Sequence, residues 1–202
     1  MEEVVKKPKT KQELQEEWMK CALDFEYFAE TYLKTEDKRI GGLVPFKLMP
    51  HQKRLINLYN NHDKVITNKY RQSGITSVTC AYAAWNICFQ KNIKAIVVGN
   101  TLGHARTELL KRIDEFIENL PEFLKIEKKK DSENHKIYHG GSEIQAAACS
   151  SQGLRGKSMN FLILDELAWY DFGDSFIMAA QSSWSTGGRV FGISTPNGVN
   201  NI

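Results

Sequence analysis

The chain has few cysteines, no long apolar run and no large excess of either charge. Its four cysteines include no Cys-x-x-Cys pair and no clustered histidines accompany them, so we expect reduced thiols rather than a disulfide framework or a zinc site. No segment approaches the ~18–20 apolar residues that a membrane span needs, and the charged amino terminus lacks the apolar core of a secretory signal. We therefore expect no membrane association. The net charge of +3 permits a nucleic-acid partner without requiring one.

The order of the apolar segments predicts an α/β fold. With 202 residues, of which 42% are hydrophobic, the chain is long enough for one domain with a substantial core. Predicted strands alternate with predicted helices, which favours a mainly parallel sheet flanked by helices on both faces. A hairpin is expected around Gly140 and Gly141. The expected strands are 65–68, 95–99, 137–139, 143–147, 160–164 and 189–194, and the expected helices are 50–59, 76–90, 101–120 and 175–184.

The amino-terminal part has a pattern of its own. Residues 1–11 form a polar, lysine-rich tail, and a helix is expected from Thr10 because Glu13 stands at the capping-box spacing. Apolar residues from Leu14 to Leu33 recur at helical spacing, so this face either packs on the domain or docks a partner protein. We expect a loop over residues 35–48. The basic run 125–130 is expected to be a solvated turn, with a DNA contact as the alternative. The predicted division is 1–44, tail and helix, and 45–202, the core.

Residues 69–77 follow a predicted strand and precede a predicted helix, which is the setting of a phosphate-binding loop. In such a loop, backbone N–H groups at the helix N-terminus attract an anion. Gly74 and Thr76 occupy the positions of the second glycine and the magnesium-binding hydroxyl. However, Lys69 replaces the first glycine and Ile75 replaces the lysine. Lys69 or Arg71 can supply the missing charge; the alternative is a solvated turn that binds no phosphate.

An acidic pair ends the strand predicted at residues 160–164. Four apolar residues precede Asp165 and Glu166, as in a buried strand whose carboxyl end lies at the ligand-binding edge of an α/β sheet. In nucleotide hydrolases the first acid holds Mg²⁺ through water, and the second takes a proton from the attacking water. The alternative is a strand that ends in two surface acids. The pattern gains weight because a phosphate-loop candidate precedes it.

Five segments of the chain resemble the motifs of one family. They match, in order, the adenine-sensing glutamine segment, the phosphate loop, the Arg-Gly segment before the acidic strand, the acidic strand and the coupling motif of the terminase large subunits of tailed bacteriophages. These proteins are ATP-driven motors that pump DNA into empty capsids. Some relatives carry the loop lysine at the start of the loop, a pattern that Lys69 fits. The five segments are Pro45–Leu48 with His51-Gln52, Tyr70–Thr76, Ser150–Gly156, Leu164–Trp169 and Ser194–Gly198.

The resemblance implies a P-loop NTPase core of the ASCE type that binds ATP and Mg²⁺. It implies that Gln52 reads adenine and that Thr76 and Asp165 hold the metal. Glu166 would position the attacking water, and Arg155 would be a γ-phosphate or coupling residue.

The resemblance also assigns the loop and the coupling motif. Lys69 and Arg71 would act on the phosphates, and the coupling motif would sense the γ-phosphate. The further residues implied to bind the nucleotide are Gln72, Ser73, Gly74, Ile75, Ser77, Ser194, Thr195 and Asn197.

The implied function is ATP hydrolysis that drives double-stranded viral DNA into the procapsid. The implied partners are the DNA, a portal protein, a small terminase subunit and further copies in a ring, in the host cytoplasm and transiently at the procapsid portal. We expect a truncated core that lacks the second ATPase subdomain and the nuclease of the relatives, so DNA cleavage by this chain is not expected.

Two alternatives stay open at this point. A helicase-like ATPase shares the glutamine, the loop and the Asp-Glu strand, but it usually carries a Ser-Ala-Thr motif where this chain has residues 194–197. The second alternative is a degenerate nucleotide-binding or assembly module, in which Ile75 marks lost catalysis.

Overall fold

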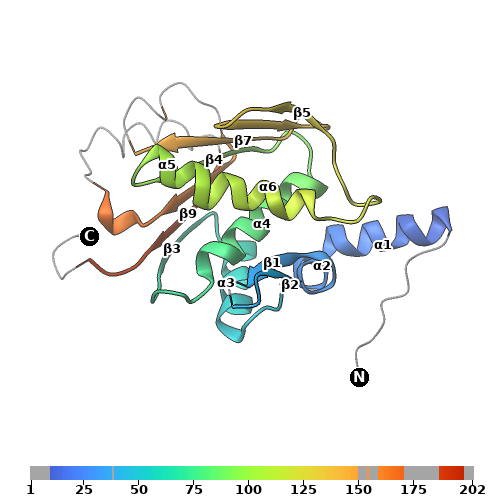
Figure 1. Cartoon of the computed structure of the whole chain (residues 1–202), viewed down its shortest axis with the longest axis horizontal. Helices are drawn as coiled ribbons and strands as arrows, with labels where there is room; N and C mark the ends of the chain where they lie inside the picture. The colour runs from blue at the N-terminus through green and yellow to red at the C-terminus, as the bar shows by residue number, and fades with distance from the viewer. Residues whose placement is uncertain (1–9, 38, 150–153, 155–158, 171–186, 198–202) are drawn as a thin grey trace.

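A seven-stranded sheet forms the centre of the computed structural model of the chain (Figure 1). The structure describes residues 10–37, 39–149, 154, 159–170 and 187–197. The strand order is β3-β9-β8-β4-β7-β6-β5; the first five run parallel, and β6 and β5 are antiparallel. This confirms the predicted fold class. The strands are β3 (Lys64–Asn68), β4 (Lys94–Gly99), β5 (Lys128–Asp131), β6 (His135–Tyr138), β7 (Glu143–Ala148), β8 (Phe161–Asp165) and β9 (Arg189–Ser194).

The central strands carry the acidic pair and the coupling segment to one edge of the sheet. Every residue of β8 is buried, as expected of a parallel strand covered on both faces. Strand β9 lies between β3 and β8, with Ser194 opposite Asn68 and Ile193 opposite Asp165. Because parallel strands share a direction, the carboxyl ends of these three strands are adjacent. The loop after β3, Thr195 and the acidic pair therefore meet.

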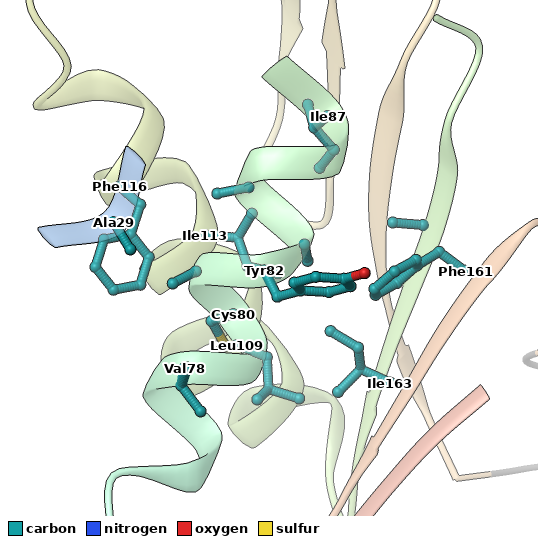
Figure 2. Close-up of a cluster of buried hydrophobic side chains, with 14 of the residues drawn as sticks. Ala29, Val78, Cys80, Tyr82, Ile87, Leu109, Ile113, Phe116, Phe161 and Ile163 are labelled. Carbon is teal, nitrogen blue, oxygen red and sulfur yellow. The ribbon is translucent and has the colours of Figure 1, made fainter. Parts of the chain in front are cut away.

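Helices pack on one face of the sheet around the central helix α4. Figure 2 shows Tyr82 of this helix beside Phe161 of β8. Val78, Cys80, Leu109 and Ile113 belong to the same apolar cluster. The elements are α1 (Lys11–Leu23), α2 (Phe25–Tyr32), α3 (Pro50–Asn61), α4 (Ile75–Phe89), α5 (Leu102–His104), the π-helical segment η1 (Ala105–Leu110), α6 (Lys111–Glu118) and the 3₁₀ turn η2 (Leu167–Trp169).

The opposite face of the sheet buries a second apolar cluster. Val98 of β4, Leu162 and Leu164 of β8 and Val190 of β9 belong to it, together with Tyr170. The helix predicted at 175–184 lies outside the described residues. Among the helices that the structure does describe, none is long and apolar enough to span a bilayer.

The amino-terminal helix differs from the prediction. The Thr10–Glu13 capping box is confirmed, but the predicted single helix is wrong, because α1 ends at Leu23 and α2 begins at Phe25. Asp24 between them is extended, and its carboxylate accepts a hydrogen bond from the Tyr27 N–H at 2.9 Å. Such a bond caps a new helix and interrupts the old one. Helix α2 packs on the domain core, while the boundary drawn at residue 44 stays a prediction.

Two segments predicted to be irregular are strands. Within the expected loop 35–48, β1 (Lys34–Asp37) pairs antiparallel with β2 (Gly42–Pro45). The chain turns between them at Gly41, whose φ of 69° suits a residue without a side chain. In the basic run 125–130, Lys128 starts β5, and its ammonium is held by Asp114 at 2.9 Å. This buried carboxylate explains why the run is not simply a solvated turn.

The predicted helix 101–120 is present but is not a regular α-helix. A π-helical segment over Ala105–Leu110 separates the short α5 from α6. Such insertions occur often at functional sites. The predicted hairpin is confirmed, since β6 and β7 flank Gly140 and Gly141, both at positive φ.

Candidate active site

The predicted loop, acidic strand and coupling segment meet at the carboxyl edge of the sheet. The Lys69 N–H donates to the Ser194 carbonyl at 2.8 Å, so the β3–β9 pairing continues into the loop. A cavity of about 570 Å³ lies at this edge. Its walls are Lys69, Gln72, Ser73, Gly74, Ile75, Thr76, Ser77, His104, Glu108, Arg112, Asp165 and Glu166.

Lys69 lies at the centre of the polar contacts. Its Nζ is 2.8 Å from Thr76 Oγ1, 3.3 Å from Asp165 Oδ1 and 3.1 Å from Glu166 Oε1. Only 10% of the Lys69 side chain is exposed. A lysine ammonium has three donors and no acceptor, so all three donors are satisfied by oxygens of this site. Lys69 therefore supplies a positive charge to the cavity, whereas Ile75, at the usual lysine position of the loop, carries no charge.

Ile75 contributes to the hydrophobic core. It is 5% exposed and belongs to the main apolar cluster. Gly74 precedes it at φ 72° and begins α4 without a side-chain cap. The first N–H groups of a helix have no intrahelical partner, so an uncapped start beside a cavity favours an anion.

Gln52 and His51 brace the loop from outside the cavity. Gln52 Nε2 donates to the Ser73 carbonyl at 3.2 Å, and its Oε1 accepts from the Met49 N–H at 3.0 Å. His51 Nε2 lies 2.9 Å from the same carbonyl. A Cβ on Gly74 would approach Gln52 Nε2 to 2.4 Å, so this contact requires glycine. The adenine-reading role of Gln52 stays a prediction, and both ends of its amide have protein partners.

Asp165 is buried between Lys69 and His104. Its Oδ1 accepts from Thr76 Oγ1 at 3.2 Å, and His104 Nε2 lies 3.3 Å from its Oδ2. Burial alone would raise the pKa of Asp165, but the hydrogen bond to His104 and the charge of Lys69 hold that pKa below its ordinary value. The same hydrogen bond raises the pKa of His104. Asp165 is therefore ionised at neutral pH, and its carboxylate can bind a cation.

Glu166 is held at both carboxylate oxygens. Oε1 faces Lys69, and Oε2 accepts from Thr195 Oγ1 at 2.8 Å. The Glu166 backbone is left-handed (φ 58°, ψ 44°), a conformation that costs free energy in a residue other than glycine and that clusters at active sites. A carboxylate positioned in this way beside a cavity can accept a proton from water.

The remaining predicted residues are placed differently. Arg71 is exposed and is not among the cavity residues. Ser194 and Asn197 lie outside the cavity, where both bond to the backbone of Ala168. Arg155 lies outside the described residues. The roles predicted for these four residues stay predictions.

The sequence reasoning missed His104, Glu108 and Arg112. Arg112 Nη1 donates to Ser77 Oγ at 2.5 Å and Nη2 donates to Glu108 Oε2 at 3.0 Å. His104 follows β4, the neighbour of β8, so the rule that ligands bind at carboxyl ends of parallel strands was the available signal. A Cβ on Gly99 would lie 2.6 Å from the His104 ring, so glycine there admits the histidine. No local pattern in the sequence predicted that Arg112 would line the cavity.

A second cavity of about 500 Å³ shares Ser77 and Arg112 with the first. It lies between the β1–β2 hairpin and α6, and its walls mix charged groups with the apolar side chains of Leu43 and Phe116. The other lining residues are Lys34, Thr35, Glu36, Gly42, Lys111, Glu115 and Asn119.

Comparisons with known proteins agree with this architecture. Residues 67–202 match the family described as terminase large subunit, T4likevirus-type, N-terminal. The chain is similar to the ATPase domain of the large terminase of Thermus phage P74-26 (TM-score 0.61, 19% identity, 77% of this chain and 67% of that one). It is also similar to the large terminase of bacteriophage HK97 (TM-score 0.67, 16% identity, 86% and 37%).

A third similar structure is the large terminase of a thermophilic bacteriophage in complex with ADP (TM-score 0.58, 18% identity, 74% of this chain and 39% of that one). At these identities the likenesses establish the fold, which is that of terminase ATPase domains. The helicase-like alternative is not favoured, since the matched family and these structures are all terminases.

We expect His104 to make the stability of the fold depend on pH. Because its pKa is raised in the folded state, its stabilising contribution is complete below about pH 6.5 and is lost as the pH rises through the raised pKa. The free energy of unfolding of wild type minus that of His104→Gln should be about 1 kcal/mol at low pH and shrink at alkaline pH. Urea unfolding across this range measures it. His62→Gln, at the exposed end of α3, is the control; a difference that does not vary with pH contradicts the assignment.

Proposed function

Because the chain belongs to the T4-type terminase large-subunit family and matches the N-terminal region of that family, we propose that it hydrolyses ATP to drive double-stranded viral DNA into a procapsid. The observation that carries the proposal is the position of Lys69 Nζ, within hydrogen-bond distance of Thr76, Asp165 and Glu166. One cation thus joins the loop to both acids that such a reaction requires. The proposed partners are the DNA, a portal protein, a small terminase subunit and further copies in a ring, in the host cytoplasm and transiently at the portal.

The phosphates of ATP are proposed to occupy the first cavity. The uncapped start of α4 faces it with unpaired N–H groups, and Lys69 and Arg112 border it. In the structure these cations pair with Asp165, Glu166 and Glu108. Phosphate oxygens offer the same charge, so Lys69 can exchange a carboxylate for a phosphate with little change in its own pairing. The flexible stem of lysine suits that exchange.

The oxygen set fits Mg²⁺. Thr76 Oγ1 and Asp165 Oδ1 are 3.2 Å apart, both are hard oxygen donors, and Asp165 is an anion. Magnesium keeps several waters and takes few protein ligands beside substrate phosphates, so these two side chains suffice. When bound, the ion would neutralise charge that develops on the phosphates. Lys69 now touches the same two oxygens, so metal binding would free its ammonium for phosphate.

Glu166 is proposed to accept the proton of the attacking water. Its carboxylate is 24% exposed and borders the cavity, so water can reach it. Lys69 contacts Oε1, which keeps a further lone pair, while Oε2 accepts from both the hydroxyl of Thr195 at 2.8 Å and its backbone N–H at 3.4 Å. Binding of phosphate by Lys69 would release Oε1 for this task.

The nucleoside end is proposed to lie in the second cavity. The two cavities share Ser77 and Arg112, so a nucleotide with its phosphates at the loop would extend past Ser77 toward the β1–β2 hairpin. This placement is an alternative to the adenine-reading role predicted for Gln52, which borders neither cavity. Leu43 and Phe116 offer apolar surface there. Arg112 would contact the nucleotide where it passes from one cavity to the other.

Removing either central residue should stop turnover. Glu166→Gln removes the proton acceptor, and Lys69→Ala removes the loop cation. Each should lower the rate of ATP hydrolysis by about 10²-fold or more. Lys129→Ala, an exposed lysine on β5, is the control and should hydrolyse ATP at the wild-type rate. Phosphate release at saturating ATP gives the rates.

The same variants separate the alternatives. Equal rates in wild type, Lys69→Ala and Glu166→Gln contradict the catalytic assignment and favour a degenerate nucleotide-binding module. ATP binding that survives Lys69→Ala and is lost in Arg71→Gln transfers the phosphate role to Arg71.

Arg112 should matter for nucleotide affinity. Arg112→Gln removes a charge-assisted contact and should weaken ADP binding about tenfold. The matched control is Arg106→Gln, an arginine on η1 that pairs with Glu133 and borders neither cavity. Isothermal titration calorimetry with ADP and Mg²⁺ measures both. Equal affinities of the two variants would place the nucleoside end elsewhere.

A further inference from the structure

The turn that follows the acidic pair is tied to the end of β9 by side-chain hydrogen bonds. The Ala168 N–H donates to Ser194 Oγ at 2.9 Å, and Asn197 Nδ2 donates to the Ala168 carbonyl at 3.1 Å. Trp169 Nε1 donates to Thr195 Oγ1 at 3.3 Å. The first two bonds fix the backbone of the turn. The third reaches a hydroxyl that itself contacts Glu166.

This third bond begins a hydrogen-bond chain with one possible direction. An indole N–H can only donate, and an ionised carboxylate can only accept. Thr195 Oγ1 therefore accepts from Trp169 and must turn its own hydrogen toward Glu166 Oε2, which lies 2.8 Å away. Without the indole, the hydroxyl could rotate toward other acceptors. Each bond in such a chain also polarises the next.

The exposure of Trp169 argues against a role in packing alone. Trp169 is 48% exposed, so much of the residue lies outside the core. Its backbone N–H bonds to the Glu166 carbonyl at 2.9 Å, which closes the 3₁₀ turn directly after the left-handed Glu166. The indole of Trp169 is thus connected, through the Thr195 hydroxyl, to the side chain of Glu166, the residue that precedes the turn.

We propose that Trp169 is a positioning residue for Glu166. Its indole N–H holds the Thr195 hydroxyl with the hydrogen directed at Oε2, and this fixes the plane of the carboxylate that accepts the proton of the attacking water. The inference rests on the proposed function. The indole borders neither cavity and reaches the site only through Thr195, so the effect of the indole N–H passes through that hydroxyl.

A double-mutant cycle tests this dependence. Trp169→Phe keeps the ring and removes the N–H. It should lower the kcat for ATP about threefold to tenfold, the equivalent of one hydrogen bond, with KM and the affinity for ADP unchanged. Thr195→Val should lower kcat at least as much, and adding Trp169→Phe to Thr195→Val should change nothing further. Adding Trp169→Phe to Thr195→Ser, which keeps the hydroxyl, should lower kcat by the same factor as in the wild-type background. Trp18→Phe, another half-exposed tryptophan, is the control.

A spectroscopic measurement tests the hydrogen bond without turnover. The chain has four tryptophans, and the indole N–H signal that disappears in Trp169→Phe identifies Trp169 in a ¹⁵N-labelled sample. That signal should move in Thr195→Val and keep its position in Thr195→Ser.

The outcomes distinguish the two proposals. An indole signal that is indifferent to Thr195→Val overturns the positioning role, as does a Trp169→Phe effect of equal size in the wild-type and Thr195→Val backgrounds. Absence of ATP hydrolysis in the wild type overturns the proposed function, while the indole signal still decides whether Trp169 directs the Thr195 hydroxyl.

Discussion

The site depends on one buried ammonium group. Lys69 Nζ lies among the oxygens of Thr76, Asp165 and Glu166 with little solvent contact. Removing one partner of such a cluster would leave uncompensated charge in a poorly hydrated place. The cluster also explains the altered loop, because a lysine supplied from the end of β3 lets Ile75 enter the core beneath α4. In the proposed function, different residues of this chain therefore supply the phosphate-binding charge and the packing of the loop helix.

The sequence predicted the features that depend on local pattern. The uninterrupted apolar run before Asp165 predicted a buried parallel strand, and alternation of strands and helices predicted the sheet. The setting of Gly74 and Thr76 predicted a loop at the start of α4. The meeting of these segments then follows, since parallel strands place their carboxyl ends at one edge of the sheet. For this reason Lys69, Thr76, Asp165 and Glu166 could be assembled from the sequence before their distances were known.

Features that depend on distant contacts were not predictable in this way. A buried Asp114 pairs with Lys128 at the start of a strand. The Asp24 cap is different, because it is a local signal three residues from Tyr27 that lay inside an apolar pattern that looks continuous. Arg112 reaches Ser77 across 35 positions, and Trp169 reaches Thr195 across 26. Such contacts arise from the spatial arrangement of elements, and no spacing rule along the chain encodes them. The π-helical segment before α6 adds to this difficulty, because it changes which faces of the helix point into the cavity.

The central claim is that Lys69 supplies the phosphate-binding charge that Ile75, at the usual lysine position, cannot supply. The most direct measurement is a crystal structure of the chain with Mg²⁺ and a non-hydrolysable ATP analogue. The account predicts that Lys69 Nζ moves from Glu166 to a phosphate oxygen, with the metal against Thr76 and Asp165. Lys69 still bound to Asp165 and Glu166, with the phosphates held by Arg71 or by backbone alone, would contradict it.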